Sequence, residues 1–299
     1  MIKGLILVNK PSGITSFSAV SRIKRLAGEK RVGHTGTLDP MATGVLPIFV
    51  GRATALCSYL LEADKIYRAT FLFGKTTDTY DVTGNVISES PVNFDASRLQ
   101  NAIENFTGEI SQVPPMYSAL KKDGVPLYKL ARRGEKVEIE PRKVVIYGIR
   151  VLKELENNEI TLEIKCSKGT YIRSLCADMG EYLGCGATLK ELCRVSTSGF
   201  DISDCVKLDD LTEDNIKNFI LSEEKAVEYM RVVSVSKPQA VRFCNGGELG
   251  LERLKFSAGE DGENLRVKYG DKLLGIGKTD ITAAAVKVKC VLTGSEELE

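Results

Sequence analysis

The most unusual part of the sequence is the stretch Arg31-Val32-Gly33-His34-Thr35-Gly36-Thr37-Leu38-Asp39-Pro40-Met41-Ala42-Thr43-Gly44-Val45-Leu46-Pro47. Its glycines and prolines predict a rigid, irregular loop that leads into a strand. The loop carries His34, the only histidine of the chain, and Asp39. Loops held by a scaffold often carry binding and catalytic residues. An Asp-Pro turn and a surface histidine are also ordinary loop features, so a functional and a structural interpretation both stay open at this point.

Helices and strands are predicted on both sides of this loop. A short buried strand over residues 5–8 ends at the turn 9–13, and Ser16 can cap the helix that follows and stops at Gly28. Downstream, hydrophobic periodicity predicts strands over residues 45–50, 66–73, 144–152 and 160–166, a helix around Leu99, Ile103 and Phe106, and a helix from about Tyr171 to Leu183. We therefore expect an α+β fold with a mixed, mainly antiparallel sheet flanked by helices.

The chain is predicted to form two domains. From Val232 onward, short β runs alternate with glycine-rich turns, which is typical of a small all-β module. Residues 201–230 carry nine acidic against three basic side chains and are predicted to be a solvated connecting segment. We expect a larger domain over residues 1–230, with a basic insertion at about 111–145, and a second domain over residues 231–299.

The composition excludes several classes of protein. A single histidine among 299 residues excludes multi-histidine zinc sites and HExxH helices. The eight cysteines are irregularly spaced and contain no CxxC pair, so we interpret them as small buried hydrophobic residues in a reducing compartment. The first apolar run, Gly4 to Val8, is too short for a signal peptide, and no stretch approaches the about 18 apolar residues of a membrane span. These features predict a soluble cytoplasmic protein.

The formal net charge of +1 conceals a strong segregation of charge along the chain. Residues 1–60 carry eight basic and two acidic side chains, and residues 111–150 carry nine and four. Because an RNA backbone meets local rather than total charge, these two segments are candidates for phosphate binding. Tyr117 and Tyr128 lie among the basic residues of the second segment, as in loops that stack on bases, although a solvated charged face has the same pattern.

Three further runs contain residues that chemistry could use. In Cys166–Leu175, a strand ends at a glycine turn and the start of a helix presents Tyr171 and Arg173. Residues 64–69 alternate polar and apolar side chains as a half-buried strand does. Residues 114–122 open the basic insertion. A capped helix with a surface arginine and an ordinary strand would explain the first two equally well.

Together these runs resemble the TruB family of tRNA pseudouridine synthases, which isomerise the T-loop uridine at tRNA position 55. The matching runs, in the family's order, are Asn9-Lys10-Pro11-Ser12-Gly13, GHTGTLDPMATGVLP over residues 33–47, Asp64 to Tyr67, Thr76-Thr77-Asp78, Val113 to Lys121, Cys166 to Leu175 and Gly184-Cys185-Gly186-Ala187. The family often has two arginines after the leucine that matches Leu192, whereas here Cys193 precedes Arg194. This difference implies one fewer local phosphate contact.

The resemblance implies a pseudouridine-synthase fold for the first domain and a PUA-like RNA-binding fold for the second. It assigns Asp39 as the catalytic carboxylate, either as nucleophile at C1′ or as base at C2′, and these alternatives stay open. Arg173 pairs with this aspartate and is expected to lower its pKa. The other residues that the resemblance places at the substrate are His34, which helps to capture the flipped-out uridine, Tyr67, which stacks on the target base, Tyr171 near the sugar, Leu192 in the uracil pocket and Lys121 in the basic insertion.

The reaction that the resemblance implies is a redox-neutral isomerisation, so we expect no metal or organic cofactor. The expected partner is the T-arm stem-loop of tRNA, with no membrane and no obligatory protein partner, and the chain is expected to act as a monomer. Two other classes stay open: a synthase guided by a separate RNA, which would need protein partners, and a catalytically idle tRNA-binding or RNA-folding protein.

Overall fold

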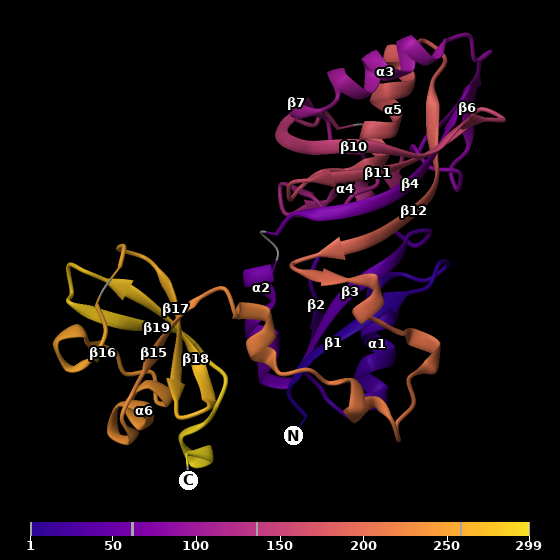
Figure 1. Cartoon of the computed structure of the whole chain (residues 1–299). Helices are drawn as coiled ribbons and strands as arrows, with labels where there is room; N and C mark the ends of the chain where they lie inside the picture. The colour runs from indigo at the N-terminus through magenta and orange to yellow at the C-terminus, as the bar shows by residue number, and fades with distance from the viewer. Residues whose placement is uncertain (1, 61–62, 136, 258, 299) are drawn as a thin grey trace.

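A computed structural model describes residues 2–60, 63–135, 137–257 and 259–298, and over these ranges the strands form two large sheets and two separate two-stranded hairpins (Figure 1). The larger sheet has ten strands. Its main path runs β14 (Val206–Lys207), β1 (Gly4–Lys10), β3 (Thr43–Val50), β12 (Ala187–Thr197), β4 (Lys65–Phe73), β11 (Glu159–Cys166), β10 (Arg142–Glu156) and β7 (Gly108–Gln112), with β2 (Val32–His34) on β3 and β13 (Phe200–Asp201) on β12. Among the described residues of this larger sheet, β1 pairs with β14 and β3 with β12 in parallel and the other neighbours are antiparallel, so the predicted mixed, mainly antiparallel sheet is confirmed.

Helices cover this sheet where the sequence has apolar residues at helical spacing. The helices α3 (Ala96–Asn105) and α5 (Ile172–Leu183) lie together against the part of the sheet that contains β4, whereas α1 (Ser16–Ala27) packs on β2 and β3 (Figure 1). The left-handed Gly28 and Gly184 end α1 and α5 as predicted. The main hydrophobic core lies between these helices and the sheet, and it includes the buried Cys166, Cys176 and Cys185.

The two halves of the large sheet meet at a short seam. β3 and β12 pair at only two positions, Thr43 with Cys193 and Gly44 with Arg194. A Cβ atom on Gly44, whose φ is +104°, would lie 2.2 Å from the Arg194 carbonyl oxygen. Only glycine therefore allows the two strands to approach here. The seam lies immediately after the Asp39 loop, so it determines where that loop leaves the sheet.

The acidic segment 201–230 is not the solvated connection that its charge predicts. Most of its acidic side chains are exposed, but Leu208, Leu211 and Ile216 are buried in the main core. Its strand β14 pairs with β1, and Leu221 exchanges two backbone hydrogen bonds with Leu5. The net charge of the segment does not reveal this packing, because a few apolar side chains bury enough surface to hold an otherwise acidic segment against the core.

The second sheet confirms the predicted C-terminal β module. It has five strands, in the order β15 (Arg231–Ser234), β17 (Asn264–Tyr269), β18 (Lys272–Asp280), β19 (Ala285–Val291) and β16 (Leu249–Gly250). The helix α6 (Lys237–Cys244), which the sequence analysis did not predict, packs on this sheet through Ala240 and Phe243. Its start carries a capping box formed by Ser236 and Gln239.

The remaining elements are short. They are α2 (Cys57–Leu60), the hairpin β5 (Lys75–Thr77) with β6 (Val86–Glu89), the hairpin β8 (Lys121–Lys122) with β9 (Val125–Pro126), α4 (Leu127–Arg132), and the 3-10 helices η1 (Gly51–Leu56), η2 (Ile202–Asp204), η3 (Leu208–Asp210), η4 (Ile216–Phe219), η5 (Glu223–Val227), η6 (Leu251–Arg253) and η7 (Ser295–Glu297). No helix within the described ranges is long and apolar enough to cross a membrane.

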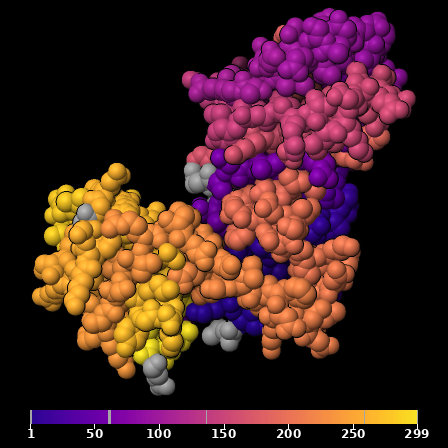
Figure 2. Space-filling view, in the orientation of Figure 1, coloured from indigo at the N-terminus to yellow at the C-terminus, as the bar shows by residue number. Residues whose placement is uncertain are grey.

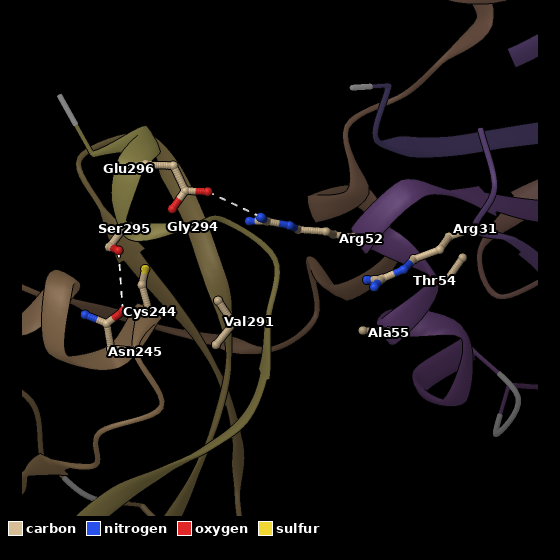
Figure 3. A pocket seen from close by; sticks show the side chains of 10 residues that line it. All are labelled: Arg31, Arg52, Thr54, Ala55, Cys244, Asn245, Val291, Gly294, Ser295 and Glu296. Carbon is tan, nitrogen blue, oxygen red and sulfur yellow. Dashed lines mark hydrogen bonds and ion pairs between the residues drawn. The ribbon is translucent and has the colours of Figure 1, made fainter. Parts of the chain in front are cut away.

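The C-terminal module packs directly on the side of the larger unit (Figure 2). A second apolar cluster joins Leu7, Phe49 and Leu56 to Leu273, Ile276 and Leu292. Beside this cluster a pocket of about 480 Å³ separates η1 from the module, and Arg52 reaches across it toward Glu296 (Figure 3).

Candidate active site

Asp39 lies in a loop that is tied down at several points. The loop follows β2 and precedes β3, and His34 is the last residue of β2, paired with Ile48, rather than part of the irregular loop as predicted. Gly13 donates its backbone N–H to the Pro40 carbonyl at 2.8 Å. The buried hydroxyl of Ser16 accepts from the Leu38 N–H at 2.9 Å and lies 3.1 Å from the Leu38 carbonyl oxygen.

The cap of α1 is one residue earlier than the sequence analysis expected. The Thr15 side chain accepts from the Ser18 N–H and caps the helix, while Ser16 is its first residue. Two neighbouring hydroxyl residues offered the same local signal, and only the position of the Asp39 loop decides which of them caps the helix.

Lys10 holds the Asp39 loop through a hydrogen bond to its backbone. Its side chain is fully buried, and its Nζ donates to the carbonyls of Pro11, Ile14 and Pro40 at 2.8, 2.7 and 3.2 Å. Burial lowers the pKa of Lys10 to about 8, although the charge of Asp39 acts in the opposite direction. Lys10 lies within one of the matching runs but was not a candidate site residue, because a buried lysine leaves no local sequence signal.

Asp39 forms a two-point ion pair with Arg173. The distances are 2.8 Å from Arg173 Nε to Asp39 Oδ2 and 3.0 Å from the second terminal guanidinium nitrogen to Asp39 Oδ1. Arg173 is buried near the start of α5 and also donates to the carbonyls of Thr79 and Tyr117 at 3.1 and 2.8 Å. Such bidentate contacts hold a carboxylate in one orientation. The predicted pairing is present.

Arg173 lowers the pKa of Asp39 as expected, but the net shift of this pKa is upward. Burial raises the pKa of Asp39 and outweighs the opposing effect of Arg173, and the nearby charge of Asp81 adds to the rise. Desolvation disfavours the charged carboxylate even when a cation lies beside it. The sequence shows the possible cation but not the depth of burial.

Asp81 is a second carboxylate at Arg173 that sequence reasoning missed. Its Oδ2 lies 3.8 Å from an Arg173 nitrogen, and its Oδ1 accepts hydrogen bonds from Thr79 and Thr83. The signal was present in the threonine- and aspartate-rich turn that follows Asp78, but such turns are common for local reasons. Asp81 therefore helps to fix the guanidinium that holds Asp39.

Tyr67 and Tyr171 lie within electrostatic range of Asp39. Tyr67 is a buried residue of β4, and Tyr171 is the N-cap residue of α5. Burial raises the pKa of both phenols, and the charge of Asp39 contributes to each rise. Gln112 exchanges two hydrogen bonds with the backbone of Tyr171, at 2.8 and 3.1 Å, and so fixes the start of α5.

Leu192 lines a cavity of about 770 Å³ beside the loop. Met41 and Thr43, which follow Asp39, line the same cavity, as do Val82 and Thr83. Leu192 is almost completely buried on β12. The structure therefore places Leu192 next to the carboxylate loop.

His34 and Lys121 are less closely connected to Asp39. Burial lowers the pKa of His34, and the charge of Arg194 adds to this effect, so the ring is neutral over a wider pH range than usual. Lys121 is exposed in the hairpin of β8 and β9. Within the described residues, no hydrogen bond or ion pair joins either side chain to Asp39. Over the same part of the chain, no group of three potential metal ligands is found.

The chain is similar in sequence to known proteins over most of its length. Residues 24–172 match the model "TruB family pseudouridylate synthase (N terminal domain)", and residues 173–233 match "tRNA pseudouridylate synthase B C-terminal domain". The chain is 42% identical over 282 residues to tRNA pseudouridine synthase B of Clostridium perfringens, and this alignment covers 93% of this chain and 96% of the relative. It is 45% identical over 284 residues to the protein of the same name from Clostridium tetani, with the same coverage.

The fold is also similar to solved structures. The chain in the crystal structure of a Cbf5-Nop10-Gar1 complex aligns with a TM-score of 0.76 and 27% identity, over 99% of this chain and 86% of that chain. A chain in a structure of an H/ACA RNP bound to a substrate RNA containing 2′-deoxyuridine aligns with a TM-score of 0.74 and 26% identity. On the strength of its sequence matches over almost the whole length, the chain belongs to the TruB family of pseudouridylate synthases.

Proposed function

We propose that this TruB-family enzyme isomerises uridine 55 in the T-loop of tRNA to pseudouridine, with Asp39 as its catalytic carboxylate. The observation that carries the assignment is the two-point contact between Asp39 and the buried Arg173, on a loop fixed by Lys10 and Ser16. A carboxylate held in this way is oriented before substrate arrives, which reduces the entropic cost of reaction.

The reaction needs no other reactant. The N1–C1′ bond breaks, the uracil rotates, a C5–C1′ bond forms, and the proton lost from C5 is replaced by one gained at N1. Uracil leaves as a delocalised anion, so the second carboxylic acid of a typical glycosidase is not required. Asp39 acts either as nucleophile at C1′ or as base at C2′, and both roles require its ionised form. The positive charge of Arg173 favours the ionised form at this partly buried carboxylate.

Substrate access requires the uridine to leave the stack of the T-loop. Such base flipping costs a few kcal/mol, which contacts with the extruded nucleotide can offset. We assign stacking on the base to Tyr67, contact with the sugar to Tyr171 and the apolar wall of the uracil pocket to Leu192. The burial of Tyr67 and Leu192 and the half-buried position of Tyr171, within electrostatic range of Asp39, support these roles.

Two further assignments concern binding of the RNA outside the pocket. We assign His34 to contact with the extruded bases, which a neutral ring can stack on, and exposed Lys121 to a phosphate of the T-arm. We also assign residues 1–230 to catalysis and residues 231–299 to a PUA-like RNA-binding domain. The chain then acts in the cytoplasm as a monomer, without cofactor or obligatory protein partner.

The test is to add the purified chain to an unmodified T-arm stem-loop, without guide RNA, and to map pseudouridine by carbodiimide-blocked primer extension. We expect modification at the T-loop uridine by the wild type, binding without product by Asp39→Asn, and slower but complete turnover by His34→Ala. No modification of the stem-loop by the wild type would favour an RNA-guided synthase or an idle RNA-binding protein. Turnover by a clean Asp39→Asn preparation would refute the role of Asp39.

A further inference from the structure

Arg194 is buried although the family pattern suggested a phosphate contact at this part of β12. Its side chain is 1% exposed and is among the largest fully buried side chains of the protein. It lies at the seam where β12 pairs with β3. A guanidinium in this position is shielded from RNA, so its charge must serve a purpose within the protein.

The guanidinium of Arg194 bonds to both ends of the Asp39 loop. Its Nε donates to the Val45 carbonyl at 2.8 Å, and a terminal nitrogen donates to the Gly36 carbonyl at 2.7 Å. These two carbonyls lie on either side of Asp39 in the sequence. A Cβ atom on Gly36, which has φ +65°, would lie 3.0 Å from the other terminal nitrogen of Arg194. The backbone at Gly36 therefore lies so close to the guanidinium of Arg194 that a side chain at this position would crowd it.

The same residue lies directly opposite Tyr67 on the neighbouring strand. Arg194 is the register partner of Tyr67 between β12 and β4, and its positive charge lowers the pKa of the buried Tyr67 phenol against the larger effect of burial. One rigid, planar group thus binds the loop of the catalytic carboxylate and acts by its charge on the aromatic ring that we assign to the target base. A guanidinium can donate in several fixed directions at once, whereas a lysine ammonium concentrates its donors on one atom.

A buried charge without a paired carboxylate is costly, and Arg194 has no ion pair within the described residues. Two backbone carbonyls, of Val45 and Gly36, accept from its donors instead. An apolar side chain of similar volume would avoid this desolvation cost. The cationic group therefore points to a requirement for geometry rather than to stability.

We propose that Arg194 is a positioning residue of the isomerisation, because it sets the distance and orientation between the carboxylate of Asp39 and the ring of Tyr67. Arg194 touches neither substrate nor reacting atoms in this role and acts only through the loop and the tyrosine. The inference rests on the proposed function, since it concerns the same site.

The kinetic test compares Arg194→Met and Arg194→Lys with the wild type and with Leu99→Ala. Leu99 is a buried residue of α3, whose neighbour Arg98 contacts Tyr182 at the end of α5 far from Arg173. Leu99→Ala thus lowers the melting temperature by a core defect remote from Asp39. A displacement of reacting groups by about 1 Å can cost about 100-fold in rate, so we expect a loss of about that size in the kcat of Arg194→Met. Its KM for the T-arm stem-loop should stay within about threefold of the wild type, because Arg194 is shielded from RNA.

Arg194→Lys keeps the charge but cannot donate to both carbonyls in the same fixed directions. We expect its kcat to lie between those of the wild type and Arg194→Met. The Leu99→Ala control should keep the wild-type kcat at a temperature where all variants are folded. Equal kcat for Arg194→Met and Leu99→Ala would overturn the inference, and if Arg194→Met does not fold, a wild-type kcat for Arg194→Lys would overturn it as well.

The single histidine supplies a readout that does not depend on turnover. The charge of Arg194 helps to lower the pKa of His34, so an NMR titration of the ring should give a higher pKa in Arg194→Met and a nearly unchanged value in Leu99→Ala. This measurement reports the local structure even if the stem-loop is not the substrate, which separates failure of the inference from failure of the proposed function. An unchanged His34 titration in Arg194→Met would show that the guanidinium does not lie against the loop.

Discussion

At the scale of single residues, the site is built around a carboxylate whose environment opposes its charge. Burial raises the pKa of Asp39, and two buried cations, Arg173 and Lys10, compensate in part. The proposed reaction needs the ionised form. The residue that was easiest to predict from the sequence is therefore the one whose chemistry depends most on its surroundings.

The rate should consequently fall on the acid side at a higher pH than an ordinary aspartate would cause. Because the pKa is raised, protonation removes the active carboxylate while a normal aspartate is still ionised. The single-turnover rate on saturating stem-loop, measured against pH, gives this limb. Far-ultraviolet circular dichroism over the same range serves as the folding control. A rate that stays constant down to the usual aspartate pKa would contradict the assignment.

Ser16 and Thr15 provide a matched pair that separates support of the loop from capping of the helix. Ser16→Ala leaves the Leu38 N–H buried without its acceptor, and we expect a loss of about 1–3 kcal/mol in stability together with a lower rate. Thr15→Ala removes the cap of α1 and should cost about 1 kcal/mol without a comparable change in rate. Urea unfolding and single-turnover rates of both variants check this. Equal rates would argue against a role of Ser16 in holding the loop.

At the scale of elements, the seam between β3 and β12 joins the two halves of the large sheet, and it lies directly after the Asp39 loop. The predicted strands and helices are present because their apolar periodicity is local. Their pairing was not predictable in the same way, since β3 meets β12, far away in the sequence, at only two positions. Gly44 at this contact was visible in the sequence, whereas the Arg194 carbonyl that leaves no room for a side chain there was not.

Gly44→Ala should therefore destabilise the protein more than substitution of a glycine that has only an unusual backbone angle. Both Gly44 and Gly199 have positive φ, +104° and +78°, but a Cβ atom would collide only at Gly44. Gly199→Ala should cost about 1–2 kcal/mol, the penalty of the left-handed conformation alone. Gly44→Ala should cost clearly more and lower the rate, because the Asp39 loop shifts. Urea unfolding of both variants is the measurement, and equal losses would contradict the role of the seam.

At the scale of the whole molecule, an apolar cluster and the partly buried ion pairs of Glu224 with Arg266 and Lys268 join the C-terminal module to the larger unit. The cluster of Leu7, Phe49 and Leu292 is buried, whereas the ion pairs of Arg52 with Glu296 and Glu297 lie at the edge of an open pocket (Figure 3). Exposed ion pairs contribute little, because water and salt screen them. The relative position of the two units should therefore be insensitive to salt.

Leu292→Ala and Arg52→Ala test this division. We expect Leu292→Ala to cost about 2–5 kcal/mol, because it leaves a cavity at the junction of the two units. Arg52→Ala should cost less than about 1 kcal/mol at physiological salt. Thermal and urea unfolding at low and high salt give both values. A larger loss for Arg52→Ala would mean that the ion pairs of Arg52, and not only the apolar cluster, fix the module.

The sequence by itself determined most of the long helices and strands, the α+β class, the Asp39 loop and, through its motifs, the candidate site residues. These features depend on local backbone preferences and on short runs of residues, which any part of a chain carries with it. Only the tertiary structure decided that His34 belongs to a strand, that segment 201–230 is packed, that burial raises the pKa of Asp39 and that Arg194 faces inward. Burial and long-range pairing depend on which distant surfaces fit together, and no local pattern contains that information.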